Sequence, residues 1–235
     1  PNVADGTTIF AALTKGFVPG RDGPKLVLET IENTLPGIYK GNTVYVAGPS
    51  HAEEVVMGKI TGLVAASENP KNSIKVRELL RVPGILCYSS FDVIGVQICS
   101  AAKNVVAVVY GALDAVAQHS QIFGDNTESL LLAAGLNEIQ TLGMAMGATH
   151  SETFTSIAGV GDLDVTCKSK YGRNRRFGQD LINTDMLDKF SNLDDLIANI
   201  SKVGYLPEGA VACKYIHEIA QKKGLRLTIC DGLYR

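Results

Sequence analysis

The sequence predicts a chain in two parts, an α/β part over residues 1–92 and an all-α part over residues 93–235. In the α/β part, short β-branched runs alternate with longer amphipathic stretches, a pattern typical of parallel strands joined by crossover helices. Beyond Phe91 the alternation stops and apolar residues recur every three or four positions, which is the spacing of helices packed on a core. No Pro-, Gly- or Ser-rich linker separates the parts, so we expect one helix, starting near Phe91, to pass from the first into the second.

Strands and helices are expected to follow one another in the α/β part. The β-branched runs predict strands over residues 7–13, 43–47, 62–66 and 84–89. Amphipathic spacing predicts helices over residues 24–35, 50–58 and 72–80. In the all-α part, one apolar series runs from Ile94 to Ala112 and a second from Leu130 to Ala148, so each predicts a long helix with a buried face.

Composition and charge exclude several classes of function. Of the 235 residues, 46% are hydrophobic, enough for a substantial core, and the formal net charge of -2 provides no general attraction for nucleic acid. Apolar stretches such as residues 105–110 fall far short of the roughly 20 residues that a bilayer requires, and no signal-peptide pattern opens the chain. We therefore expect a soluble cytoplasmic protein that neither binds nucleic acid nor inserts into a membrane.

The cysteines and histidines predict no disulfide framework and no metal site. Five cysteines lie far apart without any C-x-x-C pair, and four histidines show no ligand spacing. The cysteines stand mostly in apolar surroundings, so we expect buried, reduced thiols.

Lys103 stands out because its helical neighbours are small or apolar. Residues three and four positions away are Cys99, Ser100, Val106 and Ala107. Burial there would lower the pKa of the lysine toward the range in which it gives or takes a proton near neutral pH. The alternative is a lysine at an exposed helix edge whose ammonium reaches water.

Asp162 follows a pair of glycines in the segment Ala158-Gly-Val-Gly-Asp-Leu163. Such an aspartate could be an ordinary N-cap of the helix that follows. It could equally be a buried counter-charge that positions a catalytic lysine, because an opposite charge within about 4–6 Å favours the ionised form.

Five cations lie within the nine residues from Lys168 to Arg176, with no acid among them. Such a run is usually a solvated face. Here, however, the corner Gly172-Arg-Asn174 leads into a helix and offers a guanidinium, an amide and free helix N–H groups, which together suit one phosphate. Nucleic acid would need a patch that extends further.

The segment Val46-Ala-Gly-Pro-Ser-His-Ala-Glu-Glu54 reads as a strand, a glycine turn and a helix start. Ligands bind at this edge of an open α/β sheet, so the Gly48 amide and the Ser50 hydroxyl are candidates for ligand contact. A helix capped by Ser50 with Glu53 at its third position explains the same residues without a ligand, and both interpretations can hold together.

Taken together, these segments resemble the bacterial type of NAD(P)-dependent glycerol-3-phosphate dehydrogenase. The resemblance covers the chain from about Leu13 onward and rests on motifs that follow one another in family order. They are Leu13-Thr-Lys-Gly16, Ala47-Gly-Pro-Ser-His-Ala-Glu-Glu54, Ala102-Lys-Asn-Val105, Gly124-Asp-Asn126, Ala158-Gly-Val-Gly-Asp-Leu163, Thr166-Cys167 and Arg173-Asn-Arg-Arg-Phe-Gly178. Each motif is weak alone, and the ordered set is specific.

The resemblance implies a reversible hydride transfer between NAD(P)H and dihydroxyacetone phosphate, which gives sn-glycerol 3-phosphate for glycerophospholipid supply. The residue that matches Lys103 is the family's proton donor and acceptor at the substrate oxygen, and Asp162 matches the acid beside it. Lys15 matches a second lysine that contacts substrate and cofactor. The cofactor is expected to be NAD or NADP, and the family resemblance also implies a homodimer.

Further residues match the family's ligand contacts. Those that match substrate contacts are Gly48, Ser50, Gly172, Arg173 and Asn174, the last three at the corner that holds the phosphate. Those that match cofactor contacts are Lys15, Ala52, Arg173 and Glu208.

The family's opening G-x-G-x-x-G and first βαβ unit have no counterpart in this sequence. A short piece of the family's C-terminus also has no counterpart after Arg235. We therefore expect the α/β part to be the later part of a Rossmann-like dinucleotide-binding domain, and the all-α part to be a helical catalytic and substrate-binding domain. On this interpretation the chain alone would be inactive.

Two other functions fit parts of the pattern. A related two-domain dehydrogenase acting on a hydroxy acid would use Arg173 and Asn174 to bind a carboxylate. A non-catalytic helical interaction module would use the cationic run to dock a partner.

Overall fold

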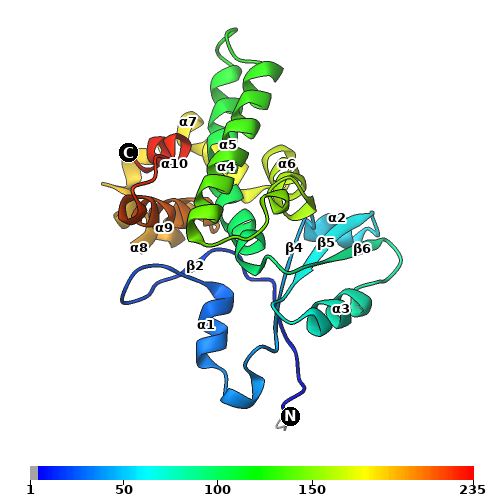
Figure 1. Ribbon diagram of the computed structural model, residues 1–235. Coiled ribbons are helices and arrows are strands. Elements are labelled where there is room, and N and C mark those ends of the chain that lie inside the picture. The colour runs from blue at the N-terminus through cyan, green and yellow to red at the C-terminus, as the bar shows by residue number, and fades with distance from the viewer. Residues whose placement is uncertain (1–4) are drawn as a thin grey trace.

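The computed structural model describes residues 5–235 and has a small sheet below a larger helical region (Figure 1). A four-stranded sheet has the order β1-β4-β5-β6, and a separate two-stranded ribbon joins β2 and β3. The strands are β1 (Phe10–Ala12), β2 (Phe17–Val18), β3 (Lys25–Leu26), β4 (Thr43–Ala47), β5 (Thr61–Ala66) and β6 (Ile85–Ser90). The helices of this part are α1 (Val27–Thr34), α2 (Ala52–Val56) and α3 (Pro70–Leu79).

The sheet is mixed, so the expectation of parallel strands throughout is wrong. β1 pairs with β4 and β5 pairs with β6 in parallel, but β4 and β5 are antiparallel. A crossover helix between parallel strands must cover the sheet with an apolar face. α2 has five residues and none of them is buried, so the chain after β4 turns back beside the same strand.

Both faces of the sheet are covered, which explains the continuous apolar run of β4. All five residues of β4 are buried. Tyr45 and Ala47 pack on one face against residues of α1 and of the long helix α4 (Val93–Ala117), while Val44 and Val46 pack on the other with Val76 of α3. A strand buried on both sides loses the polar alternation of a half-exposed one.

Most element boundaries lie close to those predicted, but the strand predicted over residues 7–13 covers only Phe10–Ala12, and the first helix begins late. The strand predicted over residues 43–47 has those bounds, and the long helix predicted to begin near Phe91 begins at Val93. The helix predicted over residues 24–35 begins only at Val27, because Lys25 and Leu26 pair with Val18 and Phe17. Two-residue strands are too short to show a period of their own, so this ribbon was not predicted.

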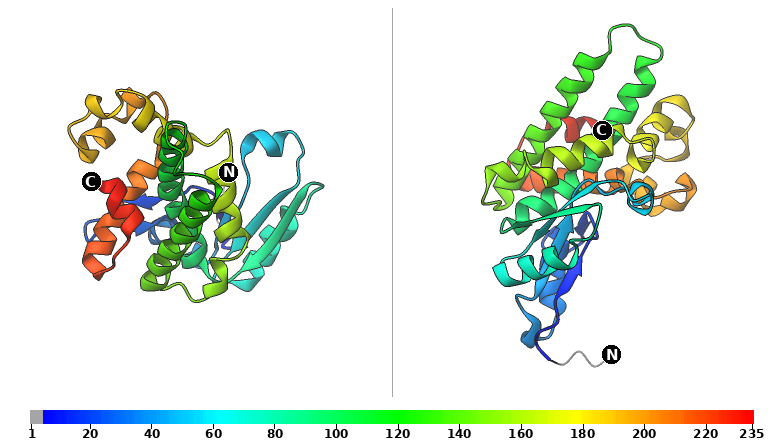
Figure 2. Two further views of the ribbon diagram at one scale, coloured as in Figure 1. Left: turned by 90° about the horizontal axis from the view of Figure 1, so that it is seen from above. Right: turned by 90° about the vertical axis from the view of Figure 1, so that its right-hand side faces the viewer.

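α4 is the axis of the helical region. Asp92 caps its first turn, where the Gly95 N–H donates to Asp92 Oδ1 at 3.0 Å. α4 and α5 (Asp125–Met146) form a hairpin that extends away from the sheet (Figures 1 and 2). The remaining helices are α6 (Asp162–Lys168), α7 (Arg173–Asn183), α8 (Leu193–Ala198), α9 (Glu208–Lys223) and α10 (Thr228–Tyr234), with a π-helical turn, Ile157–Gly161, before α6.

Glycines allow α7 to lie directly against the backbone of α4. A Cβ atom added at Gly111 of α4 would lie 1.9 Å from the Arg175 carbonyl oxygen. One added at Gly178 of α7 would lie 1.8 Å from the Val108 carbonyl oxygen. No side chain fits at such distances, so both positions require glycine, and the contact holds the start of α7 beside the middle of α4.

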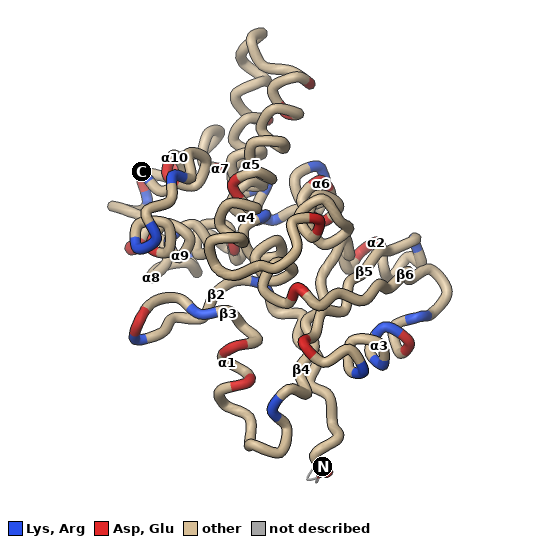
Figure 3. Tube along the Cα trace, viewed as in Figure 1, with Lys and Arg blue, Asp and Glu red and all other residues tan. Residues whose placement is uncertain are grey.

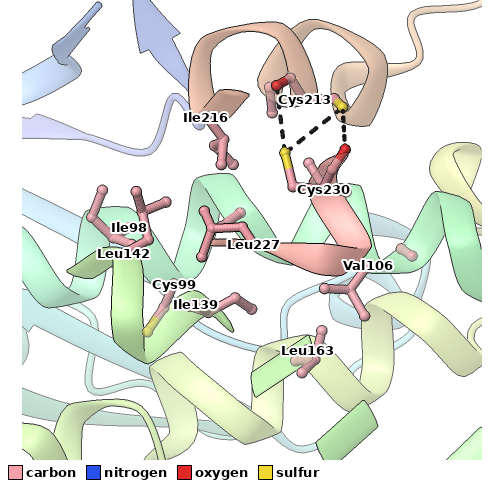
Figure 4. Packing of buried hydrophobic residues seen from close by; sticks show 14 of the residues in the cluster. Ile98, Cys99, Val106, Ile139, Leu142, Leu163, Cys213, Ile216, Leu227 and Cys230 are labelled. Carbon is pink, nitrogen blue, oxygen red and sulfur yellow. Dashed lines mark hydrogen bonds between the residues drawn. The ribbon is translucent and has the colours of Figure 1, made fainter. Parts of the chain in front are cut away.

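α4 is long and apolar enough to cross a membrane by length and composition, but 89% of its apolar window is buried inside the protein. Burial of this extent is typical of a helix in the core of a folded domain. Around α4 lies the main apolar core, part of which is drawn in Figure 4. The thiols of Cys213 and Cys230 lie there, hydrogen-bonded to each other at 3.8 Å and not joined by a disulfide. Four of the five cysteines are buried, and the exception, Cys87, is half-buried.

Candidate active site

A cleft of about 700 Å³ opens between the sheet and the helical region, with part of α4 at its floor. One wall comes from the β1–β2 corner and the start of α2, and the other from the starts of α7 and α9. Eight of the residues singled out from the sequence line it: Lys15, Ser50, Ala52, Lys103, Gly172, Arg173, Asn174 and Glu208. Residues from five separate elements and loops therefore meet around one space.

Lys103 reaches the cleft from the buried face of α4. The residue is 3% exposed, so the alternative of a lysine whose ammonium reaches water is wrong. Burial lowers its pKa to about 8, an effect that the charge of Asp162 opposes and that of Lys15 reinforces. An ammonium with such a pKa can both release and regain a proton near neutral pH.

Asp162 is the buried counter-charge of Lys103. The Lys103 ammonium donates to Asp162 Oδ1, and the aspartate is 1% exposed. The N-cap interpretation is wrong, because Gly161 occupies the cap position and Asp162 is the first residue of α6. The π-helical turn before it brings the chain back on itself, with the Val160 N–H donating to the Phe154 carbonyl at 2.8 Å. Asp162 itself does not line the cleft and lies behind the lysine.

Lys15 lies on the corner between β1 and β2, which Tyr45 holds in place. The Tyr45 hydroxyl donates to the Thr14 carbonyl at 3.0 Å, and the tyrosine is 1% exposed. Gly16 has a φ of +109°, which permits the tight turn that directs the chain away from the sheet. A buried side chain of β4 therefore fixes the residue next to a cleft lysine.

The corner Gly172-Arg-Asn174 lies at the start of α7, where Arg173 is partly exposed and Asn174 is bonded to two neighbouring segments. Arg173 pairs with Glu208 at 3.1 Å, and its side chain is 56% exposed. Asn174 donates to Asn104 Oδ1 at 3.0 Å and accepts from the Gly209 N–H at 2.8 Å. Asn174 thus joins α4, α7 and α9, and it shapes the corner while its remaining amide hydrogen can serve a ligand.

The five cations from Lys168 to Arg176 do not form one patch. Lys168 pairs with Asp164 at 2.7 Å, Arg175 with Asp114 at 2.5 Å, and Arg176 lies over the ring of Tyr205 at 4.9 Å. Of the five, only Arg173 lines the cleft. Basic and acidic positions are interspersed along the trace as a whole (Figure 3), so the cation that the cleft gains from this run is local.

In the turn after β4, some of the residues predicted to contact ligands line the cleft and one does not. Gly48 has a φ of +139°, and an added Cβ would lie 2.5 Å from the Gly62 carbonyl oxygen, so this glycine is required by the packing of β4 on β5. Gly48 does not line the cleft, whereas Ser50 and Ala52 do. The interpretation of Ser50 as a helix cap is wrong, because α2 begins after His51 and the Ser50 hydroxyl donates to the Gly48 carbonyl at 3.1 Å.

Other cleft residues were not singled out from the sequence. They are mainly Thr14, His51, Glu53, Asn104, Thr166 and Tyr171. Most lie inside or beside the quoted motifs, so the signal was their adjacency to Lys103, Ser50 or Gly172. Within residues 5–235, no group of three or more His, Cys, Asp or Glu side chains is placed to hold a metal ion.

Comparison with known proteins agrees with this arrangement. Family models for the C-terminus and the N-terminus of NAD-dependent glycerol-3-phosphate dehydrogenase match residues 92–235 and 2–73. The chain is 66% identical over 227 residues to the glycerol-3-phosphate dehydrogenase [NAD(P)+] of Treponema denticola and 36% identical over 229 residues to that of Clostridium botulinum. The match to the Treponema protein covers 96% of this chain and 64% of that protein. The match to the Clostridium protein covers 97% of this chain and 63% of that protein.

A solved relative shares the fold across the same extent. The 2.1 Å crystal structure of glycerol-3-phosphate dehydrogenase from Coxiella burnetii matches with a TM-score of 0.78 at 28% identity, over 97% of this chain and 64% of that one. The chain thus spans about 64% of the length of the relatives that it matches. It is a Rossmann-like α/β part followed by a helical part, and it belongs to the NAD-dependent glycerol-3-phosphate dehydrogenase family.

Proposed function

We propose that this chain carries the proton-transfer and phosphate-binding residues of an enzyme that interconverts dihydroxyacetone phosphate and sn-glycerol 3-phosphate. The observation that carries the proposal is the buried pair of Lys103 and Asp162 at a cleft whose opposite wall presents Arg173. We assign residues 1–92 to the dinucleotide-binding domain and residues 93–235 to the catalytic domain.

Lys103 acts at the substrate oxygen. In the direction of reduction, a hydride adds to the carbonyl carbon while the Lys103 ammonium donates a proton to the developing alkoxide. In the reverse direction, neutral Lys103 takes the hydroxyl proton as the hydride leaves. Asp162 keeps the ammonium oriented and raises the pKa of Lys103 against the effect of burial, and Lys15 supplies a second positive charge beside the same oxygen.

The cleft has room for a nicotinamide cofactor next to a small substrate. Its volume of about 700 Å³ lies in the range of sites that hold a ligand much larger than a triose phosphate. When bound, NAD or NADP supplies or accepts the hydride. Lys15, Ala52, Arg173 and Glu208 would contact it, and the pair of Arg173 and Glu208 at 3.1 Å joins the two late segments of that wall.

The substrate phosphate is assigned to the corner at the start of α7. α7 has eleven residues and opens with no acidic side chain in its first turn, so its free N–H groups favour an anion. Arg173 adds a guanidinium, Asn174 one amide hydrogen, and Gly172 a backbone that bears no side chain. Gly48, which is also family-matched, is held by its close packing on Gly62, and its contact with substrate stays a prediction.

The test is the substrate preference of the full-length protein. We expect NAD(P)H oxidation with dihydroxyacetone phosphate, and a loss of at least about 10²-fold in kcat/KM with dihydroxyacetone, which lacks the phosphate. A preference for a 2-oxo or 3-oxo acid would instead support the hydroxy-acid dehydrogenase.

The proposal includes a homodimer in the cytoplasm, in keeping with a family of NAD(P)-dependent enzymes on small substrates. Sedimentation with and without glycerol 3-phosphate tests it. Assembly without any binding of the phosphate ligand would favour a non-catalytic interaction module and contradict the enzymatic role.

A further inference from the structure

His51 lines the cleft, and within residues 5–235 its imidazole forms no hydrogen bond with the protein. It is the N-cap residue of α2, yet the cap is made by its backbone: the His51 carbonyl accepts from the N–H groups of Glu54 and Val55, both at 3.0 Å. Among residues 5–235 no protein group forms a hydrogen bond with its imidazole. Both ring nitrogens are therefore available to a ligand.

Three other polar side chains of the cleft are engaged within the protein. Thr166 donates to the Asp162 carbonyl at 2.6 Å, and Ser50 donates to the Gly48 carbonyl at 3.1 Å. Asn174 uses its oxygen and one hydrogen within the protein. Lysine and arginine side chains can only donate. A neutral imidazole can donate and accept at once, which is the pattern that matches a hydroxyl group.

The surroundings of His51 keep the imidazole neutral. Half-burial lowers its pKa, and the positive charges of Lys103 and Lys15 lower it further, while Glu53 and Asp162 act in the opposite direction. At neutral pH the ring therefore carries no charge, so one nitrogen is a donor and the other an acceptor.

The arrangement of the cleft walls places His51 near the end of the substrate that lies away from the phosphate. α2 and α9 lie on opposite sides of α4 in Figure 1. The phosphate corner belongs to the wall formed by α7 and α9, Lys103 lies on α4, and His51 stands at the start of α2. A three-carbon substrate with its phosphate at Arg173 and its carbonyl at Lys103 directs its remaining carbon toward α2. In dihydroxyacetone phosphate that carbon carries a free hydroxyl.

We infer that His51 binds the free hydroxyl of the triose phosphate and thereby selects a hydroxylated substrate over an analogue that lacks this group. The inference rests on the proposed function and assigns to the same cleft a specificity-determining residue. The contact needs no charge on His51 and no change in the proton transfer at Lys103.

The test compares dihydroxyacetone phosphate with hydroxyacetone phosphate, which keeps the carbonyl and the phosphate but has a methyl group in place of the hydroxymethyl. In the full-length protein, His51→Phe should lower kcat/KM for dihydroxyacetone phosphate by about 10- to 100-fold and leave that for hydroxyacetone phosphate within about threefold. His51→Gln, which keeps a neutral donor and acceptor, should retain most of the selectivity. His119→Phe, at an exposed position outside the cleft, is the matched control and should change neither value.

Two results would overturn the inference. One is an equal loss for both substrates in His51→Phe, which would mark a general disturbance of the cleft. The other is a change confined to the KM of the nicotinamide cofactor, which would place His51 at the cofactor instead.

A second measurement separates this inference from the proposed function. In the wild-type protein, NMR resonances of the His51 imidazole should shift on addition of glycerol 3-phosphate and not on addition of inorganic phosphate. Absence of turnover in the wild type contradicts the proposed function. In that case the NMR titration still tests His51, because resonances that do not shift with glycerol 3-phosphate would contradict the inference. Turnover with unchanged selectivity in His51→Phe contradicts the inference alone.

Discussion

The Lys103 ammonium donates to the Asp162 carboxylate within the core, although 59 residues separate them in the sequence. Their side chains are 4% and 2% exposed. The two residues come from α4 and from the first turn of α6, which follows the π-helical segment. Because Lys103 lies at the floor of the cleft with Asp162 behind it, the same contact links the stability of the helical region to the chemistry proposed for it.

Asp162→Asn should destabilise the protein at pH 7. Removing one partner of a buried ion pair leaves an uncompensated charge, which costs about 3–5 kcal/mol of unfolding free energy. Urea unfolding of the variant measures the loss. Asp164→Asn is the matched control on the same helix, since the pair of Asp164 and Lys168 is about half-exposed and its loss should cost less than about 1 kcal/mol. Equal stability of the two variants would contradict the role of the buried pair.

The pH dependence of turnover should follow Lys103. Its pKa is lowered to about 8, so protonated lysine predominates below that value and neutral lysine above it. Reduction of dihydroxyacetone phosphate should therefore slow as pH rises through about 8, whereas oxidation of glycerol 3-phosphate should accelerate. Between about 8 and the ordinary value of 10.5 the unfolded chain binds the proton more tightly than the folded one, so this group adds stability as pH rises.

Asp162→Asn provides the check on that assignment. Because the negative charge of Asp162 raises the pKa of Lys103, its removal should move the pH limb of kcat to lower pH. A limb that stays in place in this variant would assign the titration to another group.

Arg173→Ala should raise the KM for dihydroxyacetone phosphate. Loss of the guanidinium removes a charge-assisted contact to the phosphate, worth about 1.5–3 kcal/mol or roughly 10- to 100-fold in binding. Arg176→Ala is the control on the same helix, because Arg176 lies over Tyr205 outside the cleft and should leave the KM unchanged. Similar effects from both substitutions would mean that the cationic run acts only through its general charge.

Gly111→Ala should disrupt the contact between α4 and α7. The added methyl group would lie 1.9 Å from the Arg175 carbonyl oxygen, so the helices must separate, and a loss of about 2 kcal/mol or more in unfolding free energy is expected. Gly232→Ala, in α10 with open space around the added atom, should be neutral or stabilising by up to about 1 kcal/mol. Thermal unfolding of the two variants measures the difference, and a stable Gly111→Ala protein would contradict the close packing.

Much of the fold follows from patterns that short segments carry. The apolar run over residues 43–47 predicts β4 because a strand buried on both faces needs no polar alternation. The direction of β5 relative to β4 does not follow, because it depends on whether the intervening helix covers the sheet, and α2 buries none of its residues. The β2–β3 ribbon was missed because its pairing lies between segments too short to show a period.

The candidate site shows the same limit. The apolar neighbours of Lys103 left burial and an exposed helix edge both open, and the structure shows burial. Most of the residues singled out from the ordered motifs line the cleft, but Gly48 and Asp162 do not. The partners of Arg175 and Asn174 could not be predicted, because Asp114, Asn104 and Gly209 lie 61, 70 and 35 residues away along the chain. The five cations from Lys168 to Arg176 therefore looked like one site in the sequence. In the structure, ion pairs hold Lys168 and Arg175 elsewhere, and of the five only Arg173 lines the cleft.

Lys103→Met in the full-length protein removes the group proposed to transfer the proton to and from the substrate oxygen. Because this change leaves the Asp162 carboxylate buried and unpaired, the double variant with Asp162→Asn is measured beside it to secure a folded protein. We expect kcat for dihydroxyacetone phosphate to fall by about 10²- to 10⁴-fold in both variants, while the double variant recovers stability. Wild-type turnover in either variant would contradict the role of Lys103 in proton transfer.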